Sequence, residues 1–290
     1  MRHDLASKNG APPTLGPLTT GLSLAQVVAR LSKKPAVEGI LVMGSGGTPD
    51  MHPASDYDLF VVLNSMPAPL YLVATEIDHR LAEIYFGSTE KLQGYIAAEP
   101  PLQPVDIDAA VIRWLQTGRL AFDRSGLLSR AQDRFRQREW QDWFKPQTDL
   151  QLHQTWFSVN YNLAHTRRML ASPDPVYRTA VDLRLLYTVM EVWQAYFKLR
   201  RLPSLGEKHD IRYLAANDPE YLDLFRCCLA EPDRARKFEL YGRLADIALA
   251  PMGGLWQEGT TAMQLRGDTQ WQPDTVDNAL TFWRELVTEG

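Results

Sequence analysis

Asp56 and Asp58 stand one residue apart at the start of the apolar run DYDLFVVL, which ends at Leu63. In a β-strand, residues i and i+2 point to the same face, so the two carboxylates are expected to project side by side. Two carboxylates so close together repel each other unless a cation lies between them. A pair of aspartates that bridges two hard cations is the arrangement that two-metal phosphoryl transfer needs. The spacing therefore predicts that Asp56 and Asp58 bind two Mg²⁺ ions and take part in catalysis.

A glycine-rich turn, Gly44-Ser45-Gly46-Gly47, precedes the aspartates and follows a first apolar run. Glycines let backbone amides approach a phosphate closely, and the hydroxyl of Ser45 adds a further donor. We therefore expect Gly44, Ser45 and Gly46 to bind the phosphates of a nucleotide. The alternative is an ordinary loop, because turns are rich in Asp and Gly, in which Asp58 accepts hydrogen bonds from the turn amides.

The order of these features is more specific than any one of them. An apolar run, the letters GS, a loop, the letters DYDL and a second apolar run resemble the Gly-Ser…Asp-h-Asp-h signature of the DNA polymerase-beta-like nucleotidyltransferase superfamily. The local spacing looks like that of the aminoglycoside (streptomycin/spectinomycin-type) adenylyltransferases. The resemblance is clear over 37–63 and continues to about Gly126, where LAFDRSGLL looks like the family segment hLYDRDG. It extends loosely into the second half of the chain.

The family uses a third carboxylate from a neighbouring strand, and Glu83, in RLAEIYFG, matches it best. The resemblance implies that Glu83 either assists metal binding or acts as the general base that deprotonates an acceptor hydroxyl. The alternative for Glu83 is a surface glutamate on an edge strand. Asp106 and Asp108 are the other candidates, although helix capping explains at least Asp106 without any catalytic role.

The segment SLGEKHDIRYL resembles the family's Ser-Lys-Asp segment, whose lysine contacts the nucleotide phosphates. Lys208 is the matching position, so the resemblance implies that it binds the nucleotide. The preceding residue is Glu207, where the family has Ser. The alternative for Lys208 is a solvated loop lysine.

The activity that the resemblance implies is Mg²⁺-dependent transfer of a nucleoside monophosphate, AMP from ATP, to a hydroxyl of a small-molecule acceptor, with release of pyrophosphate. Protein AMPylation is a second possibility. A third is a catalytically weak or inactive nucleotide-binding or interaction module on the same fold. The loop TPDMHPAS contains no Arg or Lys, unlike the Arg- and Gly-rich loop of the family, which leaves more of the phosphate binding to the metals and to Lys208.

The elements that must position these residues alternate between helix and strand in the first half of the chain. Periodicity, caps and glycines predict helices at 23–35, 69–81 and 105–118 and one starting at 127, strands at 37–44, 56–63 and 82–87, and a short strand and turn at 119–126. In the second half the strands stop, and helical spacing is found at 152–170, 177–199, 210–216, 219–229, 232–249 and 274–288. The predicted class is α+β, a small mixed-sheet nucleotidyltransferase domain followed by an α-helical bundle.

These elements predict three parts: a flexible N-terminal arm at 1–22, a nucleotidyltransferase domain at 23–145 and a helical domain at 146–290. The chain has 290 residues, of which 45% are hydrophobic and 23% charged, as in an ordinary globular protein. Its net charge of -4 gives no general attraction to nucleic acid, which makes a nucleic-acid partner unlikely on this ground. No apolar run is long enough to span a membrane and the N-terminal stretch lacks the apolar core of a signal peptide, so we expect a cytoplasmic protein of unknown oligomeric state. The adjacent Cys227 and Cys228 are expected to be reduced core thiols.

Overall fold

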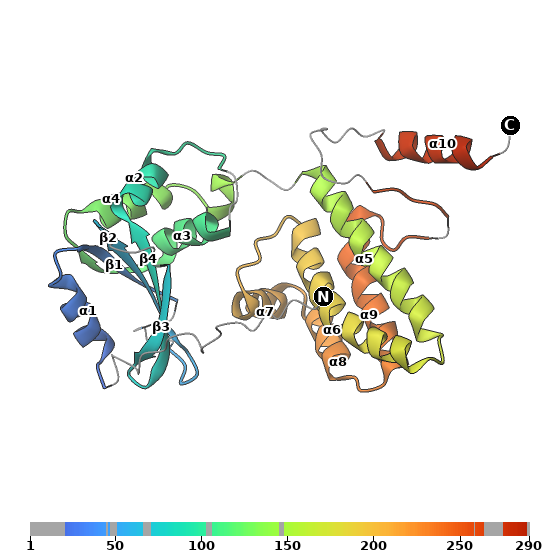
Figure 1. Ribbon diagram of the computed structural model, residues 1–290, viewed down its shortest axis with the longest axis horizontal. Helices are drawn as coiled ribbons and strands as arrows, with labels where there is room; N and C mark the ends of the chain where they lie inside the picture. The colour runs from blue at the N-terminus through green and yellow to red at the C-terminus, as the bar shows by residue number, and fades with distance from the viewer. Residues whose placement is uncertain are drawn as a thin grey trace, which may run out of the picture. The chain divides into compact units, whose positions relative to one another are not determined.

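The computed structural model describes residues 21–44, 46, 51–65, 71–102, 106–144, 148–257, 259–263 and 275–288. The chain divides into two compact units, residues 1–145, coloured blue to green in Figure 1, and residues 146–290, coloured yellow-green to red. The arm predicted at 1–22 lies outside the described residues except for its last two positions. Among the described helices, none has both the length and the apolar character needed to cross a membrane.

The described residues of the first unit form a five-stranded sheet in the order β3-β4-β2-β1-β5. The strands are β1 (Val37–Met43), β2 (Tyr57–Leu63), β3 (Leu72–Ile77), β4 (Arg80–Ser88) and β5 (Arg119–Asp123). β2 and β4 run parallel, and the other neighbouring strands run antiparallel. This mixed sheet, followed by a helical unit, confirms the predicted α+β class.

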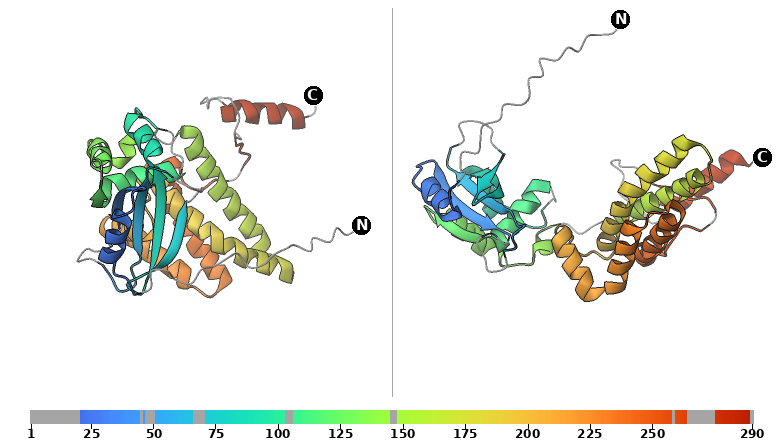
Figure 2. Two further views of the ribbon diagram at one scale, coloured as in Figure 1. Left: turned by 60° about the vertical axis from the view of Figure 1, so that its left-hand side comes forward. Right: turned by 90° about the horizontal axis from the view of Figure 1, so that it is seen from below.

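Different helices cover the two faces of this sheet (Figure 1, Figure 2). The helices of the first unit are α1 (Leu24–Ser32), α2 (Thr89–Ala97), α3 (Asp106–Thr117), α4 (Leu127–Phe135) and the 3₁₀ helix η1 (Trp140–Trp143). α1 packs on the face where Ile40 and Leu59 are buried. α2, α3 and α4 cover the opposite face, where Leu41 and Phe60 are buried. Because strand side chains alternate between faces, Asp58 lies on the same face as Phe60.

The helix predicted at 69–81 is wrong, because the described part of this stretch forms β3, a two-residue turn and the start of β4. Asp78 and His79 have φ of 52° and 59°, the left-handed conformation that a type I′ hairpin turn requires at both positions. The Asp78 carboxylate accepts hydrogen bonds from the backbone N–H of Leu24 at 3.0 Å and from the hydroxyl of Tyr57 at 3.2 Å. These contacts with α1 and β2 stabilise the turn. The apolar residues around it have helical spacing, which is why a helix was predicted.

Two further differences concern the neighbours of that hairpin. Residues 66–70, which include the start of the wrongly predicted helix, lie outside the described residues. The helix α2 was not predicted. The Ser88 hydroxyl caps its first turn by accepting a hydrogen bond from the backbone N–H of Lys91 at 3.1 Å.

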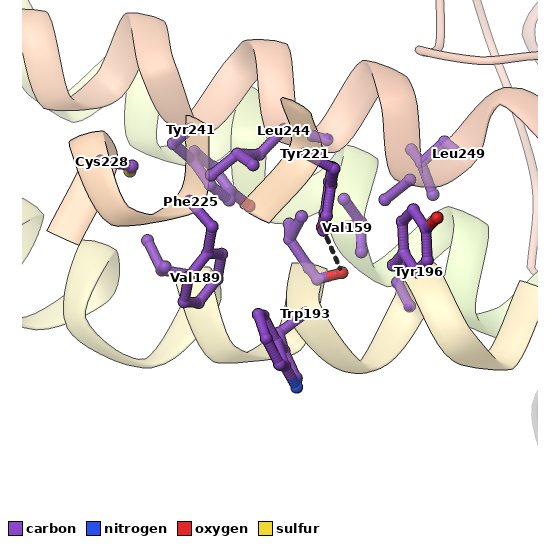
Figure 3. Close-up of a cluster of buried hydrophobic side chains, with 14 of the residues drawn as sticks. Val159, Val189, Trp193, Tyr196, Tyr221, Phe225, Cys228, Tyr241, Leu244 and Leu249 are labelled. Atoms are coloured by element: carbon purple, nitrogen blue, oxygen red, sulfur yellow. Dashed lines mark hydrogen bonds between the residues drawn. The ribbon is translucent and has the colours of Figure 1, made fainter. Parts of the chain in front are cut away.

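The second unit is helical throughout its described regular structure, which confirms each helix predicted there. Its helices are α5 (Asp149–Leu170), α6 (Pro175–Leu199), α7 (Glu207–Asn217), α8 (Pro219–Ala230), α9 (Arg234–Leu249), the 3₁₀ helix η2 (Ala250–Met252) and α10 (Thr275–Val287). The core lies between α5, α6, α8 and α9, where aromatic side chains such as Trp193 and Tyr196 are buried (Figure 3). Tyr221 satisfies its buried hydroxyl by donating to the backbone carbonyl of Val192 at 3.3 Å.

Only one of the two cysteines belongs to this core. Both thiols are free, as expected, but Cys228 is buried whereas Cys227 is exposed. The two residues are neighbours on α8, so they point about 100° apart around the helix and cannot both face the core. Burial raises the pKa of Cys228 to about 11, which makes it an unreactive thiol.

Candidate active site

Two carboxylates meet across the strands rather than along one of them. Asp58 on β2 is the register partner of Glu83 on β4 and, on its other side, of Met43 on β1. Neighbouring strands lie about 4.8 Å apart and side chains of register partners share a face, so Asp58 and Glu83 project next to each other. Both residues are half-buried. Two like charges in this arrangement repel each other, which is the electrostatic setting that favours a bound cation.

Asp56 stands just outside this pair. It is half-buried, but β2 begins at Tyr57, so Asp56 belongs to the loop that precedes the strand. The rule that residues i and i+2 share a face holds within a strand and does not fix the direction of a loop residue. That the carboxylate of Asp56 joins that of Asp58 therefore stays a prediction.

The glycine-rich turn lies directly against Asp58. Gly44 has φ of 59°, a left-handed conformation that favours glycine, and a Cβ at this position would be 3.3 Å from Oδ2 of Asp58. Gly46 is buried, and a Cβ there would be 3.1 Å from the side chain of Val42. Ser45 lies outside the described residues, so its predicted role is open. Gly44 therefore brings backbone close to the Asp58 carboxylate, whereas phosphate binding by Gly44, Ser45 and Gly46 stays a prediction.

Arg80, at the start of β4, holds the loop before Asp56. Its guanidinium donates hydrogen bonds to the backbone carbonyls of His52 at 2.9 Å, Pro53 at 2.7 Å and Ser55 at 3.0 Å. The sequence pattern of the loop gives no sign of Arg80, because the loop itself contains no basic residue and Arg80 lies about 25 residues further along the chain. The cation comes instead from the hairpin that was predicted as a helix.

Tyr85 fixes the carboxylate of Glu83. Its hydroxyl donates a hydrogen bond to Oε2 of Glu83 at 2.8 Å. Burial, then the hydrogen bond to Glu83 with the charges of Glu83 and Asp58, raises the pKa of Tyr85 well above its usual value, so the hydroxyl stays a donor. The signal for this contact was present in the sequence, because Tyr85 follows Glu83 at i+2 in the predicted strand and must share its face.

Aromatic rings immobilise Tyr85 in turn. Its ring lies 4.7 Å from that of Trp114 on α3 and 5.9 Å from that of Tyr71, measured between centroids. A cavity of about 50 Å³ adjoins these rings between β4, α2 and α3. The lining of this cavity is mainly aromatic and aliphatic, so we assign the rings a supporting role in holding the Tyr85 side chain.

The other predicted site residues lie elsewhere. Asp106 and Asp108 belong to the first turn of α3, and their side chains lie outside what the structure describes. Lys208 is exposed in the first turn of α7, in the second unit. The buried residue of that segment is Asp210, whose carboxylate accepts hydrogen bonds from the Ser204 hydroxyl at 2.6 Å and the Leu205 backbone N–H at 3.0 Å.

The segment LAFDRSGLL serves the fold in this structure. The Asp123 carboxylate caps α4 by accepting hydrogen bonds from the backbone N–H of Leu128 at 3.3 Å and of Ser129 at 2.8 Å. The Arg124 guanidinium donates to the carbonyls of Val37 at 3.0 Å and Lys34 at 3.0 Å, which ties β5 to the start of β1. Asp123 and Arg124, the two charged residues of the segment, therefore stabilise the fold of the first unit.

The donors of the site are of the kind that hard divalent cations prefer. In the part of the chain that the structure describes, no group of three or more His, Cys, Asp and Glu side chains lies close enough to hold a metal ion. Mg²⁺ does not need such a group, because enzymes commonly bind it through one or two carboxylates and complete its shell with substrate phosphates and water. Asp58 and Glu83 supply two hard oxygen donors on one face. They fit a Mg²⁺ ion that shares its coordination with a nucleotide.

Comparisons with known proteins add little to this site. No family model matches the chain, and no curated protein matches it. Among solved structures, one described as a nucleotidyltransferase-like protein from Exiguobacterium sibiricum 255-15 matches with a TM-score of 0.42 and 11% sequence identity. The match covers 77% of this chain and 72% of that one. A likeness of this degree carries no argument about fold or activity.

Proposed function

We propose that this protein is a Mg²⁺-dependent nucleotidyltransferase that transfers a nucleoside monophosphate, AMP from ATP, to a hydroxyl of a small-molecule acceptor. The observation that carries the proposal is the register pair of Asp58 and Glu83, with the left-handed turn at Gly44 packed against the Asp58 carboxylate. Paired carboxylates beside a glycine turn offer sites for a hard cation and for phosphate oxygens within one strand-loop-strand unit. The resemblance of the same residues to the Gly-Ser…Asp-h-Asp-h signature supports the same reaction.

The transfer forms a bond between the acceptor oxygen and the α-phosphorus and breaks the bond from that phosphorus to the bridging oxygen. The bond's electron pair leaves with pyrophosphate, and the acceptor hydroxyl loses its proton. Asp58, with Asp56, would hold Mg²⁺, which when bound neutralises charge on the phosphate oxygens. Gly44, Ser45 and Gly46 would leave backbone amides and one hydroxyl open to the phosphates.

Glu83 would face the acceptor. Since the Tyr85 hydroxyl engages Oε2, we assign Oε1 as the oxygen that receives the acceptor proton or binds a metal ion. Lys208 would bind the triphosphate, as its matching position in the family segment implies. The surplus of acidic residues, a net charge of -4, suits an acceptor that carries positive charge, such as an aminoglycoside.

The test of the function is release of pyrophosphate from ATP and Mg²⁺ in the presence of acceptor panels, together with calorimetry of nucleotide binding. We expect ATP to bind in a Mg²⁺-dependent manner and pyrophosphate to form with at least one hydroxylated acceptor. Absence of binding of any nucleoside triphosphate with Mg²⁺ or Mn²⁺ contradicts the proposal. Binding without pyrophosphate release across the panel favours the inactive binding module instead, and transfer of AMP to protein hydroxyls alone indicates a protein AMPylator.

The Tyr85→Phe variant tests the arrangement of Glu83. Phe keeps the ring against Trp114 but removes the hydrogen bond to Oε2, so the carboxylate loses its fixed orientation. We expect the transfer rate to fall roughly tenfold, which corresponds to about 1.4 kcal/mol of transition-state stabilisation. The measurement is kcat at saturating ATP, with the melting temperature recorded beside it. Tyr71→Phe removes a neighbouring hydroxyl that makes no described bond to Glu83 and is the matched control. Equal rates for the two variants contradict the role of Tyr85.

A further inference from the structure

The outer face of α6 is apolar along more than half of the helix. Its inner face packs into the core of the second unit through residues such as Val181, Leu185 and Val192. Large apolar side chains nevertheless continue around the solvent side, namely Val176, Leu183, Leu186, Tyr187 and Met190, whose exposed fractions run from 40% to 75%. They recur at i, i+3, i+4 and i+7 from Leu183, so they form one stripe, which we call the α6 outer face. A helix that is apolar on both sides is normally covered on both sides.

A second uncovered apolar face belongs to α10. On a helical projection, its apolar residues fall on one side, and its polar residues, apart from Thr275 at the start of the helix, fall on the other. The apolar side consists of Val276, Ala279, Leu280, Phe282, Trp283, Leu286 and Val287. Four of these, Phe282, Trp283, Leu286 and Val287, are 52% to 62% exposed. An isolated helix of 13 residues is only marginally stable in water, so α10 needs a surface on which to bury this side.

We propose that α10 docks its apolar side on the α6 outer face of the same chain. The two faces match in length. The stripe from Val176 to Met190 spans about 21 Å and the apolar side of α10 about 17 Å, at 1.5 Å per residue. Both belong to the second unit.

The segment that connects α10 to the rest of the second unit is long enough for α10 to reach the α6 outer face. Ala262, shortly before the described chain breaks off, is bound through its carbonyl to the ring of His153 on α5 at 3.1 Å. Glu191, beside Met190 on α6, accepts hydrogen bonds from Ser158 and Asn162 of α5, which lie about 8–14 Å further along that helix. The eleven residues 264–274 reach up to about 40 Å when extended, so α10 can reach the stripe from end to end.

A cleft at the edge of the stripe offers a place for an aromatic anchor. It lies between α6, α8 and α9, has a volume of about 300 Å³ and is lined by Leu185, Leu186, Val189 and Leu229 among others. Leu186, the most exposed residue of the stripe, forms its rim. Large aromatic side chains are characteristic anchors of a docked face, and α10 presents Phe282 and Trp283, which this cleft at the edge of the stripe can receive.

The experiment is chemical cross-linking of the full-length chain with a short bis-maleimide. In a Cys227→Ser background, Cys228 remains buried and unreactive. Ala279→Cys, on the apolar side of α10, is combined in turn with Thr179→Cys, Leu183→Cys and Met190→Cys on the α6 outer face. The matched control replaces Ala279→Cys by Thr281→Cys, on the polar side of α10. Leu186→Glu, added to the best pair, places a charge in the middle of the contact.

We expect at least one Ala279→Cys pair to cross-link within the monomer with at least fivefold higher yield than its Thr281→Cys counterpart, and Leu186→Glu to reduce that yield at least threefold. Cross-links found only between two chains would overturn the proposal in favour of a second copy as the occupant. Equal yields for the two sides of α10, or no cross-link in any pair, would overturn it as well. None of these residues belongs to the proposed nucleotide site, so the outcome is independent of the proposed activity.

Discussion

The Asp58→Asn variant is expected to lose nucleotidyl transfer while keeping its fold. Asn has nearly the same shape, but it removes the negative charge that would hold Mg²⁺ between Asp58 and its register partner Glu83. Loss of one preorganised electrostatic contact typically lowers kcat by about 10²–10³-fold, and we expect at least that. A thermal melt of the variant separates a loss of transfer from a loss of the fold.

The measurement is pyrophosphate release at saturating ATP and Mg²⁺, with calorimetry of ATP binding and a thermal melt as companions. Asp133→Asn is the matched control, because Asp133 is an exposed carboxylate on α4 of the same unit. It should leave turnover and binding unchanged. If Asp58→Asn retains turnover within twofold of the wild type, the carboxylate is not part of the machinery and the proposed mechanism is wrong.

The sequence predicted the central strands and the helices of the second unit because their signals are local. β1 and β2 are mainly apolar runs next to glycine or aspartate, and α5 to α9 have a 3.6-residue period, with a side-chain N-cap on each of them except α7. The β3–β4 hairpin was not predicted, because Asp78 and His79 form its turn in left-handed conformations although neither is glycine. That turn is held by contacts with α1 and Tyr57, which are distant in sequence and cannot be read from a local pattern.

The difference between local signals and contacts distant in sequence also explains which residues of the candidate site were predicted and which were not. Gly44 and Asp58 were named from their residue types and spacing and Glu83 from a resemblance, and the structure places the three together through the register of β1, β2 and β4. Arg80 could not be foreseen, because its hold on the loop before Asp56 depends on the position of the hairpin. A residue that acts through tertiary contacts leaves a sequence signal only when, like Tyr85, it shares a strand with its partner.

The Asp210→Ala variant is expected to destabilise the second unit more than any other single change near Lys208. Asp210 is 1% exposed, and its carboxylate accepts hydrogen bonds from Ser204, Leu205 and, at 3.4 Å, the indole N–H of Trp193. Alanine leaves these donors without an acceptor at the N-terminal end of α7. Hydrogen bonds to a charged group contribute roughly 1.5–3 kcal/mol each, and water can replace the lost acceptor at the exposed Ser204, so we expect about 3 kcal/mol in the free energy of unfolding.

For a unit of this size, about 3 kcal/mol lowers the melting temperature by roughly 6–12 °C. Lys208→Ala is the matched comparison, because Lys208 is exposed on the same turn of α7 and should change stability by less than about 0.5 kcal/mol. If Lys208 binds the triphosphate, its variant instead raises KM for ATP at an unchanged melting temperature. The melting temperature thus reports on Asp210, which stabilises the segment, and KM for ATP reports on Lys208, which the resemblance assigns to nucleotide binding. A melting temperature for Asp210→Ala within 2 °C of the wild type would show that the buried carboxylate is not what holds this segment in place.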